Sequence, residues 1–105
     1  MRDDRNSYDM EVIIRKYSGT GAKELLNLLE QKAGEVESML RSVDGFETYT
    51  LARAGDGGFS ITVCRDRAGI DESNRKAKEW IAKNAGNLGV NAPETLTGNV
   101  VVHAE

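Results

Sequence analysis

The segment 46–63 constrains the fold most, because it contains two alternating stretches joined by Gly55-Asp56-Gly57-Gly58. Asp-Gly between such stretches is a strong signal for a β-hairpin, since a tight primed turn needs positive φ angles. Pairing the two strands across Asp56-Gly57 divides their side chains into two sets. The first set is Phe46, Thr50, Ala52, Phe59, Ile61 and Val63, and the second is Glu47, Tyr49, Leu51, Arg53, Ser60, Thr62 and Cys64. We expect the apolar first set to pack under helices and the more polar second set to face the opposite side.

Two further strands and two helices are expected around this hairpin. Residues 10–17 and 97–104 alternate as strands. Residues 22–43 place apolar side chains at steps of three and four, which is typical of an amphipathic helix, and Gly34 allows a bend in its middle. A second helix is predicted to begin with Asp71 or Ser73 as its N-cap and to end at Gly86, with residues 65–69 as a polar connection before it.

The resulting order is strand, helix, strand, strand, helix, strand. Two right-handed crossover units joined by a hairpin give a ferredoxin-like βαββαβ sandwich, in which one four-stranded antiparallel sheet carries both helices on one face. We expect residues 9–105 to form this single domain and residues 1–8, which are charged and without period, to be a flexible tail.

Composition excludes several classes of function. The net charge of −3, with mixed signs along the chain, argues against a nucleic-acid partner, which requires a clustered basic surface. The apolar runs are far too short to span a membrane. Cys64 is the only cysteine, so a disulfide within the chain and a multi-cysteine metal site are both excluded, and we expect a cytoplasmic protein without metal or cofactor.

Two helices can cover only one face of a four-stranded sheet. We expect the other face to carry Ile13, Arg15, Tyr17, Tyr49, Leu51, Arg53, Ser60, Thr62, Cys64, Val101 and His103. This set is too apolar for full exposure and too polar for a dry core. It therefore predicts a homodimer formed through the uncovered face, with a partly polar interior.

The chain also resembles a known superfamily. The residues that carry the resemblance are Gly45-Phe46, the stretch 56–63, the helical stretch 72–81 and the stretch 98–103. Over residues 10–104 they resemble the dimeric α/β-barrel superfamily, and within it small proteins similar to antibiotic-biosynthesis monooxygenases. The resemblance implies a barrel made by two sheets across a dimer axis, with a pocket between sheet and helices.

Four residues are candidates for chemistry. His103 is the only histidine and could act as a general base, as a ligand of haem iron or another metal, or as a hydrogen-bonded residue near the dimer seam. Trp80, Tyr49 and Asn84 are the counterparts, with Asn74, of the side chains that surround an aromatic substrate in the resembling cofactor-independent monooxygenases, although Trp80 also suits a core or pocket wall. The triad of the haem-degrading members is missing from strand one, strand three and the second helix, which argues against haem degradation.

Three functions remain open at this point. The first is a homodimer with a pocket for a small-molecule ligand. The second is a cofactor-independent monooxygenase-like enzyme acting on an aromatic or polyketide-like compound. The third is a non-catalytic structural or regulatory dimer. An RNA-recognition motif shares the element order, but the chain lacks its stacking aromatics and basic surface.

Overall fold

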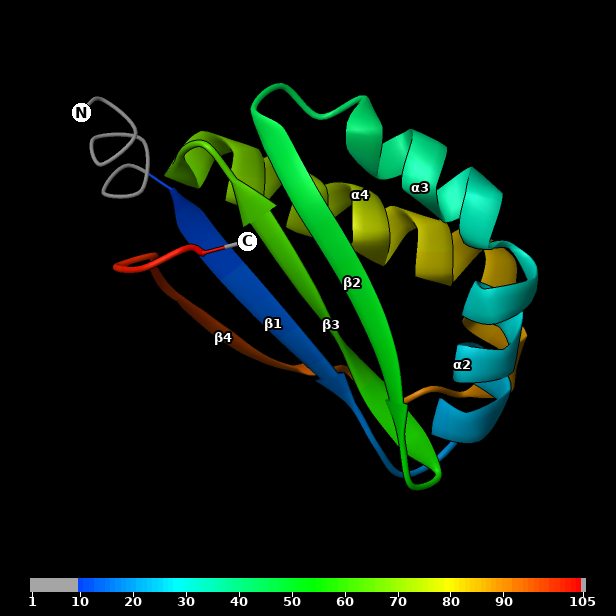
Figure 1. Cartoon of the computed structure of the whole chain (residues 1–105). Helices are drawn as coiled ribbons and strands as arrows, with labels where there is room; N and C mark the ends of the chain where they lie inside the picture. The colour runs from blue at the N-terminus through cyan, green and yellow to red at the C-terminus, as the bar shows by residue number, and fades with distance from the viewer. Residues whose placement is uncertain (1–9, 105) are drawn as a thin grey trace.

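The computed structural model describes residues 10–104, in which four strands form one antiparallel sheet with the helices on one side (Figure 1). The elements are β1 (Glu11–Tyr17), α2 (Ala22–Gln31), α3 (Ala33–Arg41), β2 (Phe46–Ala54), β3 (Gly57–Cys64), α4 (Arg67–Ala85), the 3₁₀ turn η1 (Gly86–Leu88) and β4 (Glu94–Asn99). The strand order is β2-β3-β1-β4. This arrangement confirms the predicted ferredoxin-like fold. The predicted tail, residues 1–8, lies outside the described residues.

The hairpin turn lies one residue earlier than predicted. Ala54 is opposite Gly57, so the two turn residues are Gly55 and Asp56 rather than Asp56 and Gly57. Gly55 has a φ of 59°, as the first central residue of a type II′ turn requires. Moving the turn by one residue shifts the strand pairing by two, which preserves the division of side chains into two alternating sets.

Phe46 is the exception within that division. The pairing of β2 with β3 is irregular between Phe46 and Thr48, so that Phe46 stands opposite Cys64. The added residue moves the Phe46 ring to the side of the helices, where it packs against the core, with the Arg41 guanidinium 5.8 Å from the ring centroid.

The two faces of the sheet are the reverse of the prediction. The helices cover the set with the more polar residues: Ile13, Arg15, Tyr17, Ser60, Thr62 and Cys64 are buried, and Tyr49 and Leu51 pack against the core. Arg53 is on this side too, and its Nη2 donates a hydrogen bond to the carboxylate of Glu30 on α2 at 2.8 Å. The alternation of the strands places Val12, Ile14, Thr50, Ala52, Phe59, Ile61 and Val63 on the uncovered face.

The physical reason is that both sets are apolar enough to be covered. The space between a sheet and three helices needs long side chains, which Tyr17, Tyr49 and Arg15 supply while keeping their polar ends within reach of hydrogen-bond partners. The alternation of side chains defines the two faces of the sheet, but it does not determine which face the helices cover.

The helices differ from the prediction at two points. The expected helix over 22–43 is interrupted at Lys32, with φ −106° and ψ 25°, and becomes α2 and α3. The helix α4 begins at Arg67, because the carboxylate of Asp66 accepts a hydrogen bond from the Gly69 amide at 2.9 Å. Asp66 is therefore the N-cap instead of Asp71 or Ser73, and Gly86 ends the helix as expected.

The last strand lies earlier in the chain than predicted. β4 spans Glu94–Asn99, and Asn99 stands opposite Glu11, where β1 begins. Val101 and His103 follow β4 and are exposed, so they do not lie on a sheet face. The valine-rich stretch has the higher strand propensity, but the position at which β1 begins determines how far β4 pairs. None of the helices within residues 10–104 is long and apolar enough to cross a membrane.

Candidate functional site: a pocket beside Arg15

A pocket of about 260 Å³ opens between the covered face of β1, one side of α4 and the segment that connects α4 to β4. Ala77, Ile81 and Ala85 of α4 line it together with Val90 and Pro93 of the connecting segment. Its polar wall comes from β1, which contributes Arg15 and Tyr17. Apolar walls with a few convergent polar groups are typical of a small-molecule site.

Arg15 is the central polar side chain of this pocket. Only 3% of it is exposed. Its Nε donates a hydrogen bond to the Tyr17 hydroxyl at 3.2 Å, and its Nη1 donates one to the Asn74 side-chain oxygen at 3.3 Å. Both acceptors are neutral, so the positive charge is held in the interior by hydrogen bonds alone.

A second, much smaller cavity of about 10 Å³ lies beside the pocket. The two share Arg15, Tyr17, Ala77 and Ile81, and the small cavity adds Tyr49 and Trp80 to the group. Its volume is close to what a single water molecule requires. The structure therefore brings two of the four predicted site residues, Tyr49 and Trp80, to the neighbourhood of Arg15.

Trp80 and Tyr49 have different polar surroundings in this group. The indole N–H of Trp80 donates to Oε2 of Glu35 at 2.9 Å, which ties α4 to α3. Burial raises the pKa of Tyr49 to about 12, with a further rise from Tyr17 and an opposing effect of Arg15. The Tyr49 phenol is therefore protonated at neutral pH and can donate a hydrogen bond, but it is a poor base.

Two buried hydroxyl groups lie in the same part of the covered face. Ser60 stands opposite Arg15 in the sheet, and Thr62 stands between Ile13 and Tyr49. Neither hydroxyl has a hydrogen-bond partner among the described residues. Unpartnered buried polar groups are uncommon in proteins. Together with Arg15 they make this half of the interior unusually polar.

The other two predicted site residues lie elsewhere. Asn84 is exposed on α4, donates from its side-chain nitrogen to the Trp80 carbonyl at 2.9 Å, and lines a separate groove toward α2. His103 is exposed beyond β4 and does not line the pocket. The prediction that His103 stands beside Arg15 or Tyr49 on one sheet face is wrong, because β4 ends at Asn99.

Cys64 has the properties of a structural residue. It is fully buried with Ile13 and Ile70, and burial raises the pKa of its thiol to about 11, with further contributions from Asp66 and Glu47. A protonated thiol is a weak nucleophile. Within residues 10–104 no group of three or more His, Cys, Asp or Glu side chains could hold a metal ion.

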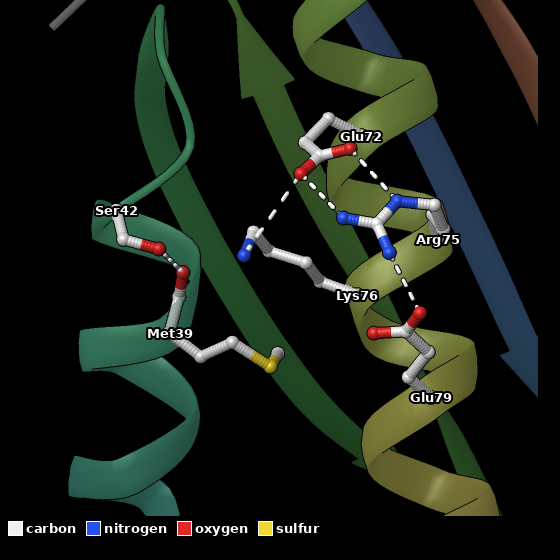
Figure 2. A network of polar contacts seen from close by, with 6 residues as sticks. All are labelled: Met39, Ser42, Glu72, Arg75, Lys76 and Glu79. Atoms are coloured by element: carbon white, nitrogen blue, oxygen red, sulfur yellow. Dashed lines mark hydrogen bonds and ion pairs between the residues drawn. The ribbon is translucent and has the colours of Figure 1, made fainter.

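The opposite side of α4 is charged and faces solvent. Figure 2 shows Arg75 between two carboxylates, with Nη1 at 2.6 Å from Glu79 and Nη2 at 2.7 Å from Glu72. Hydrogen bonding from Arg75 lowers the pKa of Glu72, and the same pair raises the pKa of Arg75. The helix thus has one solvated side and one side that lines the pocket.

Arg15 and Tyr17 were not among the sequence-predicted site residues. Because the sequence analysis assigned the other alternating set of side chains to the core, it predicted Arg15 and Tyr17 on the uncovered face. One signal was available, because a charged side chain directly after Ile13-Ile14 is unusual in the middle of an apolar strand. A charged residue at such a position is typical of a buried side chain with a functional or structural role, and not of a solvent-exposed one.

The fold and the pocket together define an α+β protein with a small-molecule-sized pocket between β1, α4 and the segment that connects α4 to β4. No family model matches the sequence, and no curated protein matches it. Solved structures do match, and at 13% identity the protein NE2512 of unknown function from Nitrosomonas europaea superposes with a TM-score of 0.70 over 95% of this chain and 96% of its own.

Oxygenases are among the matching structures, and two examples come from Streptomyces. The first is SnoaB from Streptomyces nogalater, a cofactor-independent oxygenase, with 18% identity, a TM-score of 0.62 and coverage of 87% and 92% of the two chains. The second is the monooxygenase ActVA-Orf6 of Streptomyces coelicolor in complex with nanaomycin D, with 16% identity, a TM-score of 0.55 and coverage of 92% and 90%. The predicted resemblance to antibiotic-biosynthesis monooxygenase-like proteins is thereby confirmed at the level of the fold.

Proposed function

We propose that this protein binds a small aromatic molecule in the pocket beside Arg15, as a cytoplasmic homodimer. The observation that carries the proposal is the pocket itself: about 260 Å³, with aliphatic walls from α4 and the connecting segment and with Arg15 and Tyr17 at one side. Apolar walls suit a flat ring, and the few polar groups would fix its orientation.

Obstructing the pocket tests the proposed binding directly. Ala82 is exposed and lines the pocket, so Ala82→Trp should fill it without disturbing the core. Ala68→Trp places the same side chain on an exposed position of α4 that does not line the pocket. In a calorimetric screen of dihydroxyaromatic compounds, wild type and Ala68→Trp should bind and Ala82→Trp should not. Equal binding by all three proteins would show that the ligand binds outside this pocket.

The uncovered face of the sheet supports the dimer. Val12, Ile14, Phe59 and Ile61 stand on neighbouring strands of that face, and Leu96 on β4 is 68% exposed. A continuous apolar surface of this kind favours an interface, and a second copy of the chain offers the self-complementary partner that a twofold dimer requires.

Sedimentation separates the dimer from a monomer. Ile14→Glu and Ile61→Glu each place a charge on the uncovered face and should give monomers, whereas Lys83→Glu, on the exposed side of α4, should leave the dimer intact. Sedimentation of the wild-type protein as a monomer at micromolar concentration would remove the dimer from the proposal.

A second candidate function is cofactor-independent oxygenation of the bound aromatic compound. The observation that favours it is the group of Tyr17, Tyr49 and Trp80 around Arg15, in a fold shared with oxygenases. In such a reaction the substrate must lose a proton and itself supply electrons to oxygen. The protonated Tyr49 would orient the substrate by donating a hydrogen bond, and Trp80 would form a wall.

Oxygen uptake tests the second candidate. We would compare wild type, Trp80→Phe and His103→Ala with a panel of dihydroxyaromatic substrates. A catalysed rate that falls in Trp80→Phe would support oxygenation. Oxygen uptake at the background rate in all three proteins would exclude oxygenation and leave ligand binding as the function. Absence of both uptake and binding would leave the non-catalytic dimer as the remaining function. Asn84 contacts the group through the Trp80 carbonyl, so Asn84→Ala belongs in the same comparison.

A further inference from the structure

We propose that the pocket selects ligands that carry an anionic oxygen, a carboxylate or an ionised phenol, and that Arg15 is the residue that binds it. This inference rests on the binding proposed above and adds the charge of the ligand. The argument depends on what surrounds Arg15 and on what lines the pocket.

Arg15 differs from every other arginine that the structure describes. The exposed arginines Arg41, Arg53, Arg65, Arg67 and Arg75 each have a carboxylate oxygen within 4 Å. The buried Arg15 has no carboxylate partner in residues 10–104, and its two acceptors are a phenol and an amide. The arginine with the greatest need for a counter-charge is therefore the one that lacks it.

The hydrogen-bonding capacity of Arg15 is also only partly used. A guanidinium group has five N–H donors in a planar fork, and Tyr17 and Asn74 take two of them. The remaining three, on Nη1 and Nη2, have no acceptor within the described part of the chain. A carboxylate or phenolate oxygen accepts such donors with charge assistance, and a carboxylate can do so with both oxygens.

The lining of the pocket has the charge that this ligand requires. No aspartate or glutamate lines it, whereas Lys78 adds a second cation to that of Arg15. The chain as a whole carries a net charge of −3, so the positive pocket is a local feature and does not follow from an excess of basic residues. A neutral ligand would leave the Arg15 charge uncompensated, and an anion would compensate it.

These contacts imply one orientation for the ligand. The anionic oxygen would lie at the β1 wall, against Arg15 and beside the Tyr17 hydroxyl. The ring would extend along α4, over Ala77 and Ile81, toward Val90. This orientation leaves the open side of the pocket for substituents distant from the anionic group.

A pair of isosteric probes tests the inference. The two probes are 2-naphthoate and 2-naphthamide, which share a ring system and differ in charge. By titration calorimetry at neutral pH, 2-naphthoate should bind the wild-type protein about tenfold or more tightly than 2-naphthamide, as expected for a hydrogen bond to a charged group in a buried site. Equal affinities would overturn the inference while leaving the proposed binding intact. Failure of both probes to bind would overturn the two together.

Variants assign the effect to Arg15. Arg15→Met should bind both probes with equal affinity, because it keeps the apolar stem and removes the charge. Lys78→Met should keep most of the preference, since Lys78 is exposed. A preference that persists in Arg15→Met and disappears in Lys78→Met would assign anion recognition to the rim and contradict our inference. The wild-type comparison decides the question of charge even if Arg15→Met does not fold.

Discussion

Tyr49→Phe should change how the stability of the protein depends on alkaline pH. The Tyr49 ring packs against the core, and phenylalanine keeps this ring while it lacks the hydroxyl group. Its removal should therefore leave the free energy of unfolding near neutral pH almost unchanged. The difference between the two proteins should emerge only where tyrosine ionises.

The sign and size follow from the pKa of Tyr49, which rises from 10.0 to about 12 on folding. Below pH 10 the phenol is protonated in both states and contributes nothing. From pH 10 to about 12 the unfolded chain loses this proton and the folded protein keeps it, so unfolding becomes more favourable as the pH rises. Two pKa units correspond to about 2–3 kcal/mol of stability lost over this window.

Urea denaturation at several pH values provides the assay. The stability of the wild-type protein should fall more steeply than that of Tyr49→Phe above pH 10, and the gap should approach 2–3 kcal/mol near pH 12. A pH titration followed by the ultraviolet absorbance of the phenolate should show that Tyr49→Phe lacks the tyrosine that ionises near pH 12 in the wild-type protein. Parallel stability curves for the two proteins, or ionisation of Tyr49 in the folded protein near pH 10, would refute the reasoning.

Three further predictions concern the scaffold around the site. Gly34 is in an open position of α3, so Gly34→Ala should stabilise the protein by about 0.5–1 kcal/mol in thermal denaturation. Gly58→Ala should prevent folding, because its methyl group would collide with a carbonyl oxygen of β2. A stable Gly58→Ala would contradict the sheet register. Trp80→Phe should lower the free energy of unfolding by about 2 kcal/mol. Glu35→Gln should lower it less, since glutamine keeps an acceptor for the indole N–H. Equal losses in the two variants would show that the hydrogen bond is not the cause of the loss in Trp80→Phe. Asp66→Ala should cost about 1 kcal/mol in urea denaturation through loss of the N-cap, and an unchanged midpoint would argue that α4 begins later.

Local patterns predicted the fold well because each depends on neighbours in sequence. The alternation of β1, the hairpin and the spacing of Leu25, Leu29 and Val36 were enough for the ferredoxin-like order. The start of α4 was also local, since Asp66 precedes Gly69 by three residues, but Asp71 and Ser73 offered equally plausible caps. Only the tertiary position of the chain decides among such candidates.

The site could not be predicted to the same degree because it depends on which face the helices cover. Tyr49 and Trp80 were predicted because the resemblance to cofactor-independent monooxygenases implied them, and the structure brings them near Arg15. Arg15 itself was placed on the wrong side, since both sets of alternating residues contain enough apolar surface to be covered. His103 was misplaced by the register of β4, which depends on long-range pairing with β1.

The alternation along β1 has a consequence for how this protein can change over time. Ile13, Arg15 and Tyr17 belong to the interior under the helices, while Val12 and Ile14 belong to the open face. Residues adjacent in the chain are thus under separate selective pressures, one from packing under the helices and the other from the surroundings of the open face. Substitutions on one face of β1 can accumulate during evolution without changing the other face. Tolerance to substitution along this strand should therefore vary with a period of two.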